Sequence, residues 1–412
     1  MEENILHCDA NNFYASVEIV KDPSLRGKNI AVCGDPEKRH GIILAKSNGA
    51  KACGVKTGQT IREAQALCPD LVLLQPDFPS YVKYSNALFE IYTSYTDRVE
   101  SFGLDECWLD VSGSHTLFGS SEHIAEEIRR RAREELGITL SVGISFTKVF
   151  AKLGSDYKKP DAQTLISRDN YREIAWNLPV EDILMVGASA SKFFSTVGIH
   201  TIGDLARADD KLLSAHIGQT GMTLKKWANG EEDDQVKLYY ETHKPESVGN
   251  GSTADHDLKT RVECAELITA LSERVATRLR KHGLYAGGVH LAIKYNTLRT
   301  IGKQTRLTYP TASATDLKNG ALALLDLLWH EGDLPIRTIT VTAIYPIENG
   351  EYVPTTLFED EGQSEKRTRF EKSIDEIRRK FGFDAITRSS LLKKDGDETD
   401  PFDEKAKPFK RQ

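Results

Sequence analysis

Apolar and polar positions alternate with two periodicities over the first 145 residues, one typical of strands and one typical of helices. Strand-like apolar runs and helix-like three- and four-residue spacings follow one another at 5–9, 81–96, 98–102, 107–111, 121–136 and 139–145. With residues 29–79 set aside, this order is β-α-β-β-α-β, which predicts a ferredoxin-like split unit. The segment set aside has strand patterns at 29–34, 41–45 and 71–75 and a helix capped by Thr60, so we expect a small inserted subdomain.

The rest of the chain predicts a helical segment, a linker and a second mixed domain. Residues 178–230 show helical patterns punctuated by glycines, and the polar, acidic stretch 231–246 is typical of a linker. A second β-α-β-β-α-β order follows, with strands expected at about 247–250, 286–295, 299–308 and 336–345 and helices at about 260–282 and 314–330. A further helix is predicted at about 365–380, and the charged tail after Lys393 predicts disorder. The predicted fold class is therefore multidomain α+β.

Composition narrows the class of protein. The 412 residues are 39% hydrophobic, enough for packed cores, but no apolar run approaches the roughly 20 residues that span a membrane. The acidic start, Met1-Glu2-Glu3-Asn4, lacks the basic flank of a signal peptide, so we expect a cytoplasmic protein. The six cysteines form no C-x-x-C pair, which predicts reduced thiols and no structural zinc site.

Charge along the chain matters more than its sum. A net charge of −7 argues mildly against a nucleic-acid partner. The segment 294–306 nevertheless holds Lys294, Arg299, Lys303 and Arg306 and no acid, while acids gather elsewhere, as at 231–234. A local basic surface in the second mixed domain is therefore expected.

Three acidic residues give the strongest chemical signal. Asp105 and Glu106 lie at a turn between two apolar strands, and Asp9 ends the first strand. In a split unit the first strand and the central hairpin are neighbours, so these carboxylates can converge. Clustered carboxylates suit magnesium, and two such ions can support phosphoryl or nucleotidyl transfer. The residues alone leave open a plainer role, in which the acids cap a turn and a helix. Asp110 falls on the opposite strand face and is expected to be structural.

Several lysines follow the last strand of the split unit. Lys148, Lys152, Lys158 and Lys159 lie in the segment 147–160, where they could reach a triphosphate. For Lys148 and Lys158 a solvated helix face is the better expectation.

Two further features can be interpreted in two ways. Phe13 and Tyr14, just after Asp9, can belong to the core or can form a wall for the sugar of a nucleotide. Val186-Gly187 followed by Val197-Gly198 is typical of a helix-hairpin-helix, whose backbone N–H groups contact DNA phosphates, but an ordinary helix turn is also possible.

Together these segments resemble the Y-family translesion DNA polymerases, in the DNA polymerase IV branch. The resemblance covers about residues 4–392. It rests on motifs in family order, at His7–Glu18, Gly54–Gly58, Leu104–Glu106, Ser141–Ser145, Lys148–Leu153, Lys159-Pro160, Gly198–Leu205 and Ala228–Gly230. It implies a palm at 1–28 and 76–175, fingers at 29–75, a helical thumb at 176–232, a linker at 233–246, a little finger at 247–392 and a tail at 393–412.

The resemblance also implies an activity and its site. The protein would be a template-directed DNA polymerase of low fidelity and low processivity, extending a primer 3′-OH with deoxyribonucleotides for translesion synthesis. Asp9, Asp105 and Glu106, with the Ala10 carbonyl, would bind two Mg²⁺ ions. Tyr14 would be the steric gate against ribonucleotides.

Contacts to nucleotide, DNA and partners follow from the same resemblance. Lys159 would contact the triphosphate, and Asn48 and Lys51 stand where the family usually has a Tyr and an Arg. Lys51 offers a point charge rather than a bidentate fork, which puts nucleotide affinity in question. The thumb turn at Gly187 and the basic residues of 294–306 would hold primer-template DNA. Thr355-Thr356-Leu357-Phe358 matches a sliding-clamp peptide only in part, which leaves clamp binding through Leu357 and Phe358 open. We expect a monomer.

Two other functions compete with this interpretation. Nucleotide cyclases share a metal-binding split unit, and Gly103–Cys107 is similar to their Gly-Gly-Asp/Glu-Glu-Phe turn, but the second Gly and the Phe are absent. A DNA-binding module without catalysis would be expected to lose at least one carboxylate, and all three are present.

Overall fold

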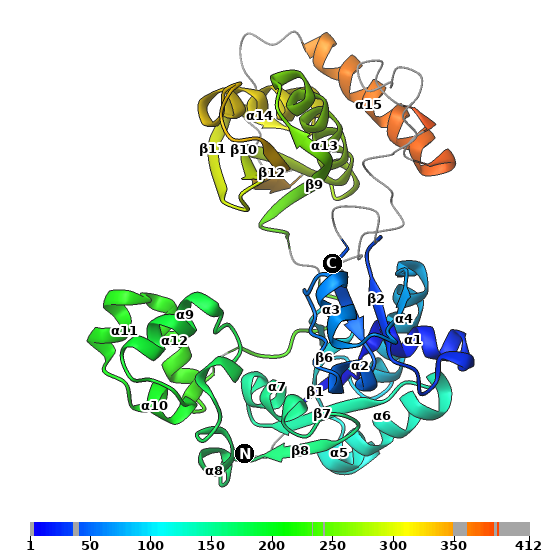
Figure 1. The fold of residues 1–412 in the computed structure, drawn as a ribbon, viewed down its shortest axis with the longest axis vertical. Coiled ribbons are helices and arrows are strands. Elements are labelled where there is room, and N and C mark those ends of the chain that lie inside the picture. The colour runs from blue at the N-terminus through cyan, green and yellow to red at the C-terminus, as the bar shows by residue number, and fades with distance from the viewer. Residues whose placement is uncertain are drawn as a thin grey trace. The chain divides into compact units, whose positions relative to one another are not determined.

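A computed structural model describes residues 4–35, 41–232, 234–241, 244–348, 361–382 and 385–386, with only the backbone course for 361–368. The chain divides into two compact units after Thr242, within the predicted linker (Figure 1). Among the described residues no helix is long and apolar enough to cross a membrane. The partial clamp motif with Leu357 and Phe358 and the predicted tail at 393–412 lie outside the described residues.

The first unit is built on a five-stranded sheet in the order β5-β6-β1-β7-β8. The strands are β1 (Ile5–Ala10), β5 (Val99–Ser101), β6 (Glu106–Asp110), β7 (Leu140–Ser145) and β8 (Gln163–Ile166). β1 pairs antiparallel with both β6 and β7, which is the order of a ferredoxin-like split unit. β8 adds a parallel strand beside β7 that the apolar pattern did not predict. The predicted split unit is therefore confirmed, with one strand more.

Helices cover both faces of this sheet. α4 (Phe78–Thr93) and α6 (Ser121–Leu136) pack on the face that carries Leu6 and Cys8. α7 (Lys148–Tyr157) packs on the opposite face, which carries His7 and Asp9, because side chains alternate along a strand. α1 (Phe13–Lys21) follows β1, and the short α5 (His115–Phe118) precedes α6.

A glycine allows α7 to lie very close to the sheet. Gly143 of β7 faces α7, and a Cβ at this position would lie 1.8 Å from the Ala151 carbonyl oxygen and 2.5 Å from the Ser155 nitrogen. Gly154 of α7 faces back toward β7, where its own Cβ would lie 3.1 Å from the Gly143 Cα. Only hydrogen atoms fit between the two backbones, so this pair fixes the distance of α7 from the sheet.

The inserted subdomain is a three-stranded sheet in the order β3-β2-β4. Its elements are β2 (Ile30–Cys33), β3 (Ile43–Lys46), α2 (Asn48–Ala52), α3 (Ile61–Leu67) and β4 (Val72–Leu74), with the 3₁₀ helix η1 (Pro23–Leu25) just before them. Thr60 caps α3 in a capping box with Glu63, as the sequence predicts. The short α2 was not predicted, because five residues carry too little periodicity.

The segment predicted as helical, 178–230, contains four α-helices and one 3₁₀ helix. They are η2 (Val180–Asp182), α9 (Ala188–Thr196), α10 (Ile202–Arg207), α11 (Asp210–His216) and α12 (Gln219–Ala228), and α8 (Tyr171–Ala175) lies just before them. Phe194, Leu205, Leu213 and Leu224 form their common core, to which Phe150 of α7 also belongs. The helical segment and α7 thus share one core.

The polar segment after α12 packs against the domain of the five-stranded sheet instead of extending into solvent. Val236 is 1% exposed and packs against Trp108 and Ala151. Lys148 is 4% exposed, and its Nζ lies 2.8 Å from Glu100 Oε2 and 2.7 Å from Asp234 Oδ2. The expectation of a solvated helix face is therefore wrong for Lys148, because the linker covers it. Lys158 is exposed, as expected.

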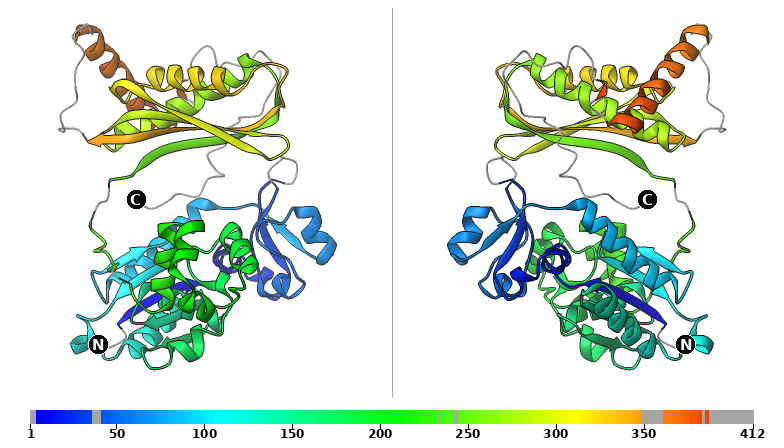
Figure 2. Two further views of the ribbon diagram at one scale, coloured as in Figure 1. Left: turned by 90° about the vertical axis from the view of Figure 1, so that its left-hand side faces the viewer. Right: turned by 90° about the vertical axis from the view of Figure 1, so that its right-hand side faces the viewer.

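The second unit has a four-stranded sheet in the order β11-β10-β12-β9. Its elements are β9 (Ser247–Leu258), α13 (Arg261–Lys281), β10 (Leu284–Tyr295), β11 (Thr300–Thr311), α14 (Ala314–Leu328), β12 (Ile336–Glu348) and α15 (Glu361–Phe381). The β-α-β-β-α-β element order is as predicted, but the second and fourth strands are central here, whereas the first and third are central in the other unit. α13 and α14 lie on one face of the sheet (Figure 2).

Candidate active site

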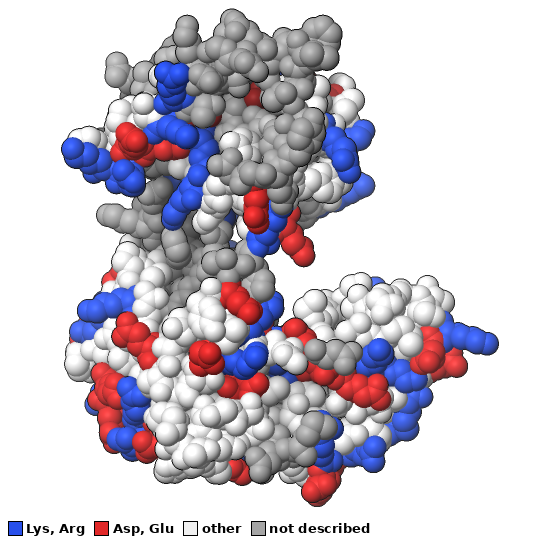
Figure 3. All heavy atoms as spheres, turned by 180° about the vertical axis from the view of Figure 1, so that it is seen from behind, with Lys and Arg blue, Asp and Glu red and all other residues white. Residues whose placement is uncertain are grey.

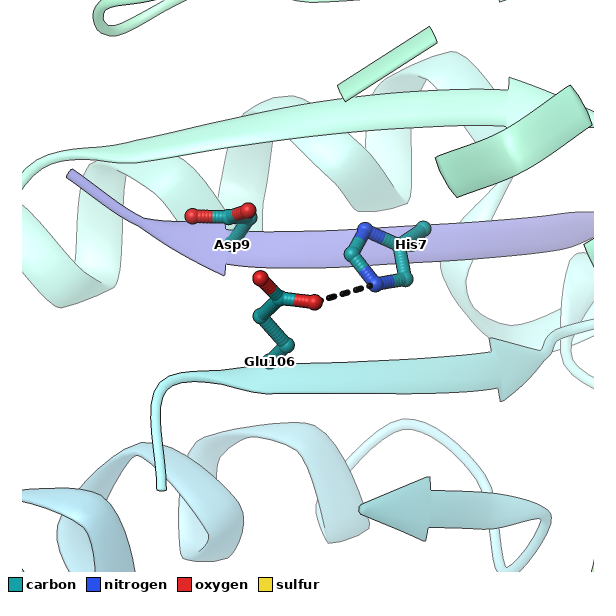
Figure 4. A group of neighbouring side chains, drawn as sticks. All are labelled: His7, Asp9 and Glu106. Carbon is teal, nitrogen blue, oxygen red and sulfur yellow. Dashed lines mark ion pairs between the residues drawn. The ribbon is translucent and has the colours of Figure 1, made fainter. Parts of the chain in front are cut away.

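The β1–β6 register brings the three acidic residues together. Asp9 and Glu106 are direct partners across the two strands, and the Ala10 N–H donates to the Asp105 carbonyl oxygen at 2.9 Å. Asp9 is 4% exposed, and the Asp105 and Glu106 side chains lie in the half-buried range. Figure 4 shows Asp9 and His7 on β1 and Glu106 on the neighbouring strand, with their side chains turned toward one another. The register thus pairs Asp9 with Glu106 and puts Asp105 at the turn just before β6. Asp105 is not among the described residues whose possible ligand atoms all lie within 4.8 Å of one another.

Two lysines of the α7 region contact these acids. Lys152 Nζ lies 2.9 Å from Glu106 Oε2 and 3.4 Å from Asp9 Oδ2. Lys159 Nζ lies 2.5 Å from Asp9 Oδ2. Both ammonium groups also contact Asp156, at 3.3 Å and 2.7 Å. A mixed cluster of carboxylates and ammonium groups thus lies at the end of β1.

Burial and mutual repulsion set the protonation of the acids. Burial, and then the neighbouring Glu106 charge, raise the pKa of Asp9 well above its usual range. The same two causes raise the pKa of Asp105 to about 6. Burial would also raise the pKa of Glu106, but His7 and Lys152 outweigh it and hold that pKa low. Burial and mutual repulsion therefore disfavour the charged forms of Asp9 and Asp105, and a bound cation would oppose both effects.

His7 also belongs to this cluster. The sequence pattern had identified it only as the first residue of the His7–Glu18 motif. It is fully buried, its Nδ1 lies 2.9 Å from Ser155 Oγ, and its Nε2 lies 3.4 Å from Glu106 Oε2. Burial lowers the pKa of His7 to about 4, so the ring is neutral at pH 7. Together His7, Asp9 and Glu106 offer ligand atoms that all lie within 4.8 Å of one another. The i, i+2 spacing of His7 and Asp9 was the available signal, because it puts both on one strand face.

The two aromatic residues after β1 have different environments. Tyr14 is half-buried and stacks on Tyr81 with ring centroids 4.3 Å apart, while Phe78 meets its edge. Phe13 is 3% exposed and belongs to the core of the sheet unit. Only Tyr14 therefore offers its surface to a ligand, and Phe13 follows the core alternative that the sequence left open.

The inserted subdomain contributes polar and basic groups beside this site. Asn48 and Lys51 are exposed on α2, and Asn12 Nδ2 donates to Asn48 Oδ1 at 2.8 Å. Lys46 of β3 is half-buried, and burial together with the charge of Lys51 lowers its pKa. Lys46 and Lys51 thus form a pair of like charges. The sequence had not indicated that Lys46 or the Asn12 side chain lies in this region.

Candidate DNA contacts occur in both units. Gly187 is exposed and precedes α9, and a Cβ there would meet nothing within 4 Å, so its backbone is open to a large ligand. In the second unit, strand alternation puts Lys294 and Arg306 on the sheet face that α13 and α14 leave open. Lys303 is paired with the buried Leu291 and therefore belongs to the helix-covered side, although it is exposed beyond the helices. Arg299 is exposed in the β10–β11 turn.

The open face is otherwise made of small and polar residues. The paired positions are Gly249, Gly251, Thr253, His290, Ala292, Thr338, Thr340 and Thr342. Such a surface is flat and rich in hydrogen-bonding groups, which suits contacts to a phosphate backbone. Figure 3 shows acidic and basic side chains interspersed over one face of the molecule, so the net charge of −7 says little about any single surface.

Comparison with known proteins decides the family. Residues 8–156 match the impB/mucB/samB family, and residues 245–351 match that family's C-terminal domain. DNA polymerase IV of Acetivibrio thermocellus is 43% identical over 396 residues, which cover 96% of this chain and 99% of that protein. DNA polymerase IV 1 of Bacillus subtilis is 34% identical over 398 residues, which cover 96% of this chain and 94% of that protein. The chain belongs to the DNA polymerase IV family.

The fold agrees with this membership. A solved Y-family DNA polymerase chimera of Dbh and Dpo4 superposes with a TM-score of 0.72 at 22% identity, covering 84% of this chain and 99% of that one. The resemblance to the Y-family translesion polymerases is thereby confirmed, and this polymerase IV chain is a DNA-directed DNA polymerase that acts in translesion synthesis. The cyclase and the non-catalytic DNA-binding interpretations are set aside.

Proposed function

We propose that Asp9, Asp105 and Glu106, with the Ala10 carbonyl, hold two Mg²⁺ ions and form the catalytic centre of this polymerase. The observation that supports this proposal is the register of β1 and β6, which pairs Asp9 with Glu106 and leaves Asp105 at the turn just before β6. The donors fit the ion, because carboxylate and carbonyl oxygens are the ligands that magnesium prefers. Burial and the nearby Glu106 charge raise the pKa values of Asp9 and Asp105, and a bound cation would favour their ionised forms.

The residues of the chain have distinct roles in this mechanism. When bound, the ions supply a more acidic primer 3′-OH and neutralise the triphosphate and its leaving group. Asp9, Asp105 and Glu106 would hold the ions, and Glu106 would act on the primer side of the site. Lys159, which contacts Asp9, would bind the incoming triphosphate. Asp9 and Glu106 are held on paired strands, and Asp105 and Lys159 lie just beside β6 and α7, so much of the geometry would be set before substrate binds.

The nucleotide would be selected by residues of α1 and α2. The Tyr14 ring, held by stacking on Tyr81, would occupy the space that a ribose 2′-OH needs. Asn48 and Lys51 would contact the triphosphate in place of the Tyr and Arg of other family members. A single ammonium group replaces a bidentate guanidinium here, so we expect weaker nucleotide binding than an Arg at position 51 would give.

Primer-template DNA would be contacted by residues of both units. The Gly187 turn would offer backbone N–H groups to phosphates, and Lys294, Arg299, Lys303 and Arg306 would contact the duplex backbone. Contacts of this kind do not depend on base sequence, as an enzyme that copies any template requires. We propose low fidelity and low processivity for this polymerase from its family. We further propose that the protein is a cytoplasmic monomer. Binding of the sliding clamp through Leu357 and Phe358 can be tested separately in a pull-down with purified clamp.

The test is extension of a labelled primer on a DNA template with Mg²⁺ and deoxyribonucleotides. Asp105→Ala and Glu106→Ala should abolish extension. Asp110→Asn should retain it, because the Asp110 carboxylate accepts a hydrogen bond from Ser112, just after β6, and lies away from the cluster. Retained activity in Glu106→Ala would contradict its assignment as a ligand.

A second experiment tests the steric gate. Tyr14→Ala should incorporate ribonucleotides while it keeps most of its use of deoxyribonucleotides, which serves as the internal control. Unchanged sugar selection would remove Tyr14 from this role.

A further inference from the structure

Asn12 has an unusual backbone conformation at the start of α1. It precedes the helix with φ 50° and ψ 40°, in the left-handed region that Asn tolerates better than most residues. An Asn at a helix start normally accepts a hydrogen bond from a backbone N–H of the first turn. Asn12 makes no such bond. Its side chain is therefore available for a contact outside its own helix.

That contact reaches the inserted subdomain. Asn12 Nδ2 donates to Asn48 Oδ1 at 2.8 Å, and Asn48 is the first residue of α2. The bond thus joins the start of α1, which carries Tyr14, to the start of α2, which carries Lys51 one turn later. Both helices are those to which nucleotide contacts have been assigned above.

The bond also decides which end of the Asn48 amide faces a ligand. Because Oδ1 of Asn48 accepts from Asn12, the group that Asn48 can offer to a nucleotide is its Nδ2 donor. This orientation matters, since triphosphate oxygens only accept hydrogen bonds. Without Asn12 the amide could turn either way, and half of its orientations would present an oxygen to the anionic ligand.

We propose that Asn12 is a positioning residue for the incoming nucleotide, acting through Asn48. It holds α2 against α1 and keeps the Asn48 donor turned toward the triphosphate. The inference rests on the nucleotide-binding role proposed above for Asn48 and Lys51. It also accounts for an Asn at a left-handed position where Gly would be the simplest choice.

Asn12→Gly is the sharpest test. Glycine adopts the left-handed conformation without strain, so the variant removes the side-chain bond and leaves the backbone in place. In steady-state primer extension, we expect the KM for deoxyribonucleotide to rise about three- to tenfold, the size of one neutral hydrogen bond, with kcat changed by less than about twofold. DNA affinity and thermal stability should match the wild type, which separates positioning from a purely structural role.

A double-mutant cycle identifies the partner. Asn48→Ala should raise KM by about as much as Asn12→Gly, and the double variant should be no worse than Asn48→Ala alone. An unchanged KM in Asn12→Gly, or additive effects in the double variant, would overturn the inference. Lys51→Ala serves as a separate control. If it leaves KM unchanged while the wild type extends primers, the nucleotide-binding role of α2 itself fails, and the inference fails with it.

Discussion

Gly143→Ala gives a direct test of the close contact between α7 and the sheet. An added Cβ would lie 1.8 Å from the Ala151 carbonyl oxygen and 2.5 Å from the Ser155 nitrogen. A Cβ and a heavy atom need about 3.0 Å at the least, so the backbone of α7 must move by about 1.2 Å. The obstructing atoms are backbone and cannot rotate away. We expect a cost at or above the upper end for overpacking, about 3 kcal/mol.

The displacement would also reach the catalytic cluster, because Lys152 lies on α7 and contacts Glu106. Hydrogen exchange over residues 148–157, followed by mass spectrometry, would report the local loss as exchange about 100-fold faster, since about 1.4 kcal/mol corresponds to a factor of ten. Primer extension should fall by about the same factor, because a shift of about 1 Å in catalytic groups costs about 100-fold.

Gly113→Ala is the matched control, since a Cβ there meets nothing within 4 Å and should leave both readouts unchanged. Exchange and extension within about threefold of the wild type in Gly143→Ala would refute the packing argument.

Three further predictions concern charge and hydrogen bonding. His7→Gln should keep most of the activity and of the Mn²⁺ binding measured by electron paramagnetic resonance, because the Gln side chain can place a donor near Glu106. The shorter side chain of His7→Asn should lose both. Equal behaviour of the two variants would count against a role of the His7 Nε2 atom. Burial raises the pKa of Glu232 from 4.5 to about 6, so the folded state holds a proton that the unfolded chain releases, and stability from this group falls as pH rises through that window. Glu232→Gln should therefore stabilise the first unit by up to about 2 kcal/mol at pH 7.5 and not at all below pH 4.5. Thermal unfolding of variant and wild type across this pH range would show it. A stability difference between the two proteins that does not change with pH would contradict the prediction. Because the pKa of Asp105 is raised to about 6, Mg²⁺ binding should release protons near pH 6 and tighten as the pH rises from about 5 to about 7. Calorimetry at pH 6 in two buffers would measure this, and no buffer dependence would exclude the linkage.

Much of the architecture follows from local patterns. The spacing of Ile124, Ile128 and Ala132 predicts α6, and the capping box of Thr60 and Glu63 predicts α3, because one buried stripe or one cap fixes a helix almost by itself. The pairing of Asp9 with Glu106 also follows once the first strand is placed beside the central hairpin, as in a ferredoxin-like split unit. The assignment of each acid to a metal, and the domain boundaries within the first unit, stay predictions.

Other features depend on partners far away in sequence. Lys148 has the pattern of a surface residue on its own helix, but its ammonium group contacts Glu100 and Asp234, which are far from it in sequence, and lies over the Trp108 ring. The sheet order of the second unit differs from that of the first although the element order is the same, because strand pairing is decided by packing and not by periodicity. β8 is four residues long, too short for its alternation to stand out.

β11 is an edge strand, and two of the basic residues discussed above lie on it. As the outermost strand of its sheet, β11 leaves one row of backbone N–H and C=O groups without a neighbouring strand of that sheet. Exposed lysines on such an edge discourage pairing with the edge of another molecule, and Lys303 and Arg306 are both exposed on this strand. Neutral substitutions there would remove protection against aggregation together with any contact to DNA. Charge-reversing variants such as Lys303→Glu keep the edge charged and so separate solubility from binding.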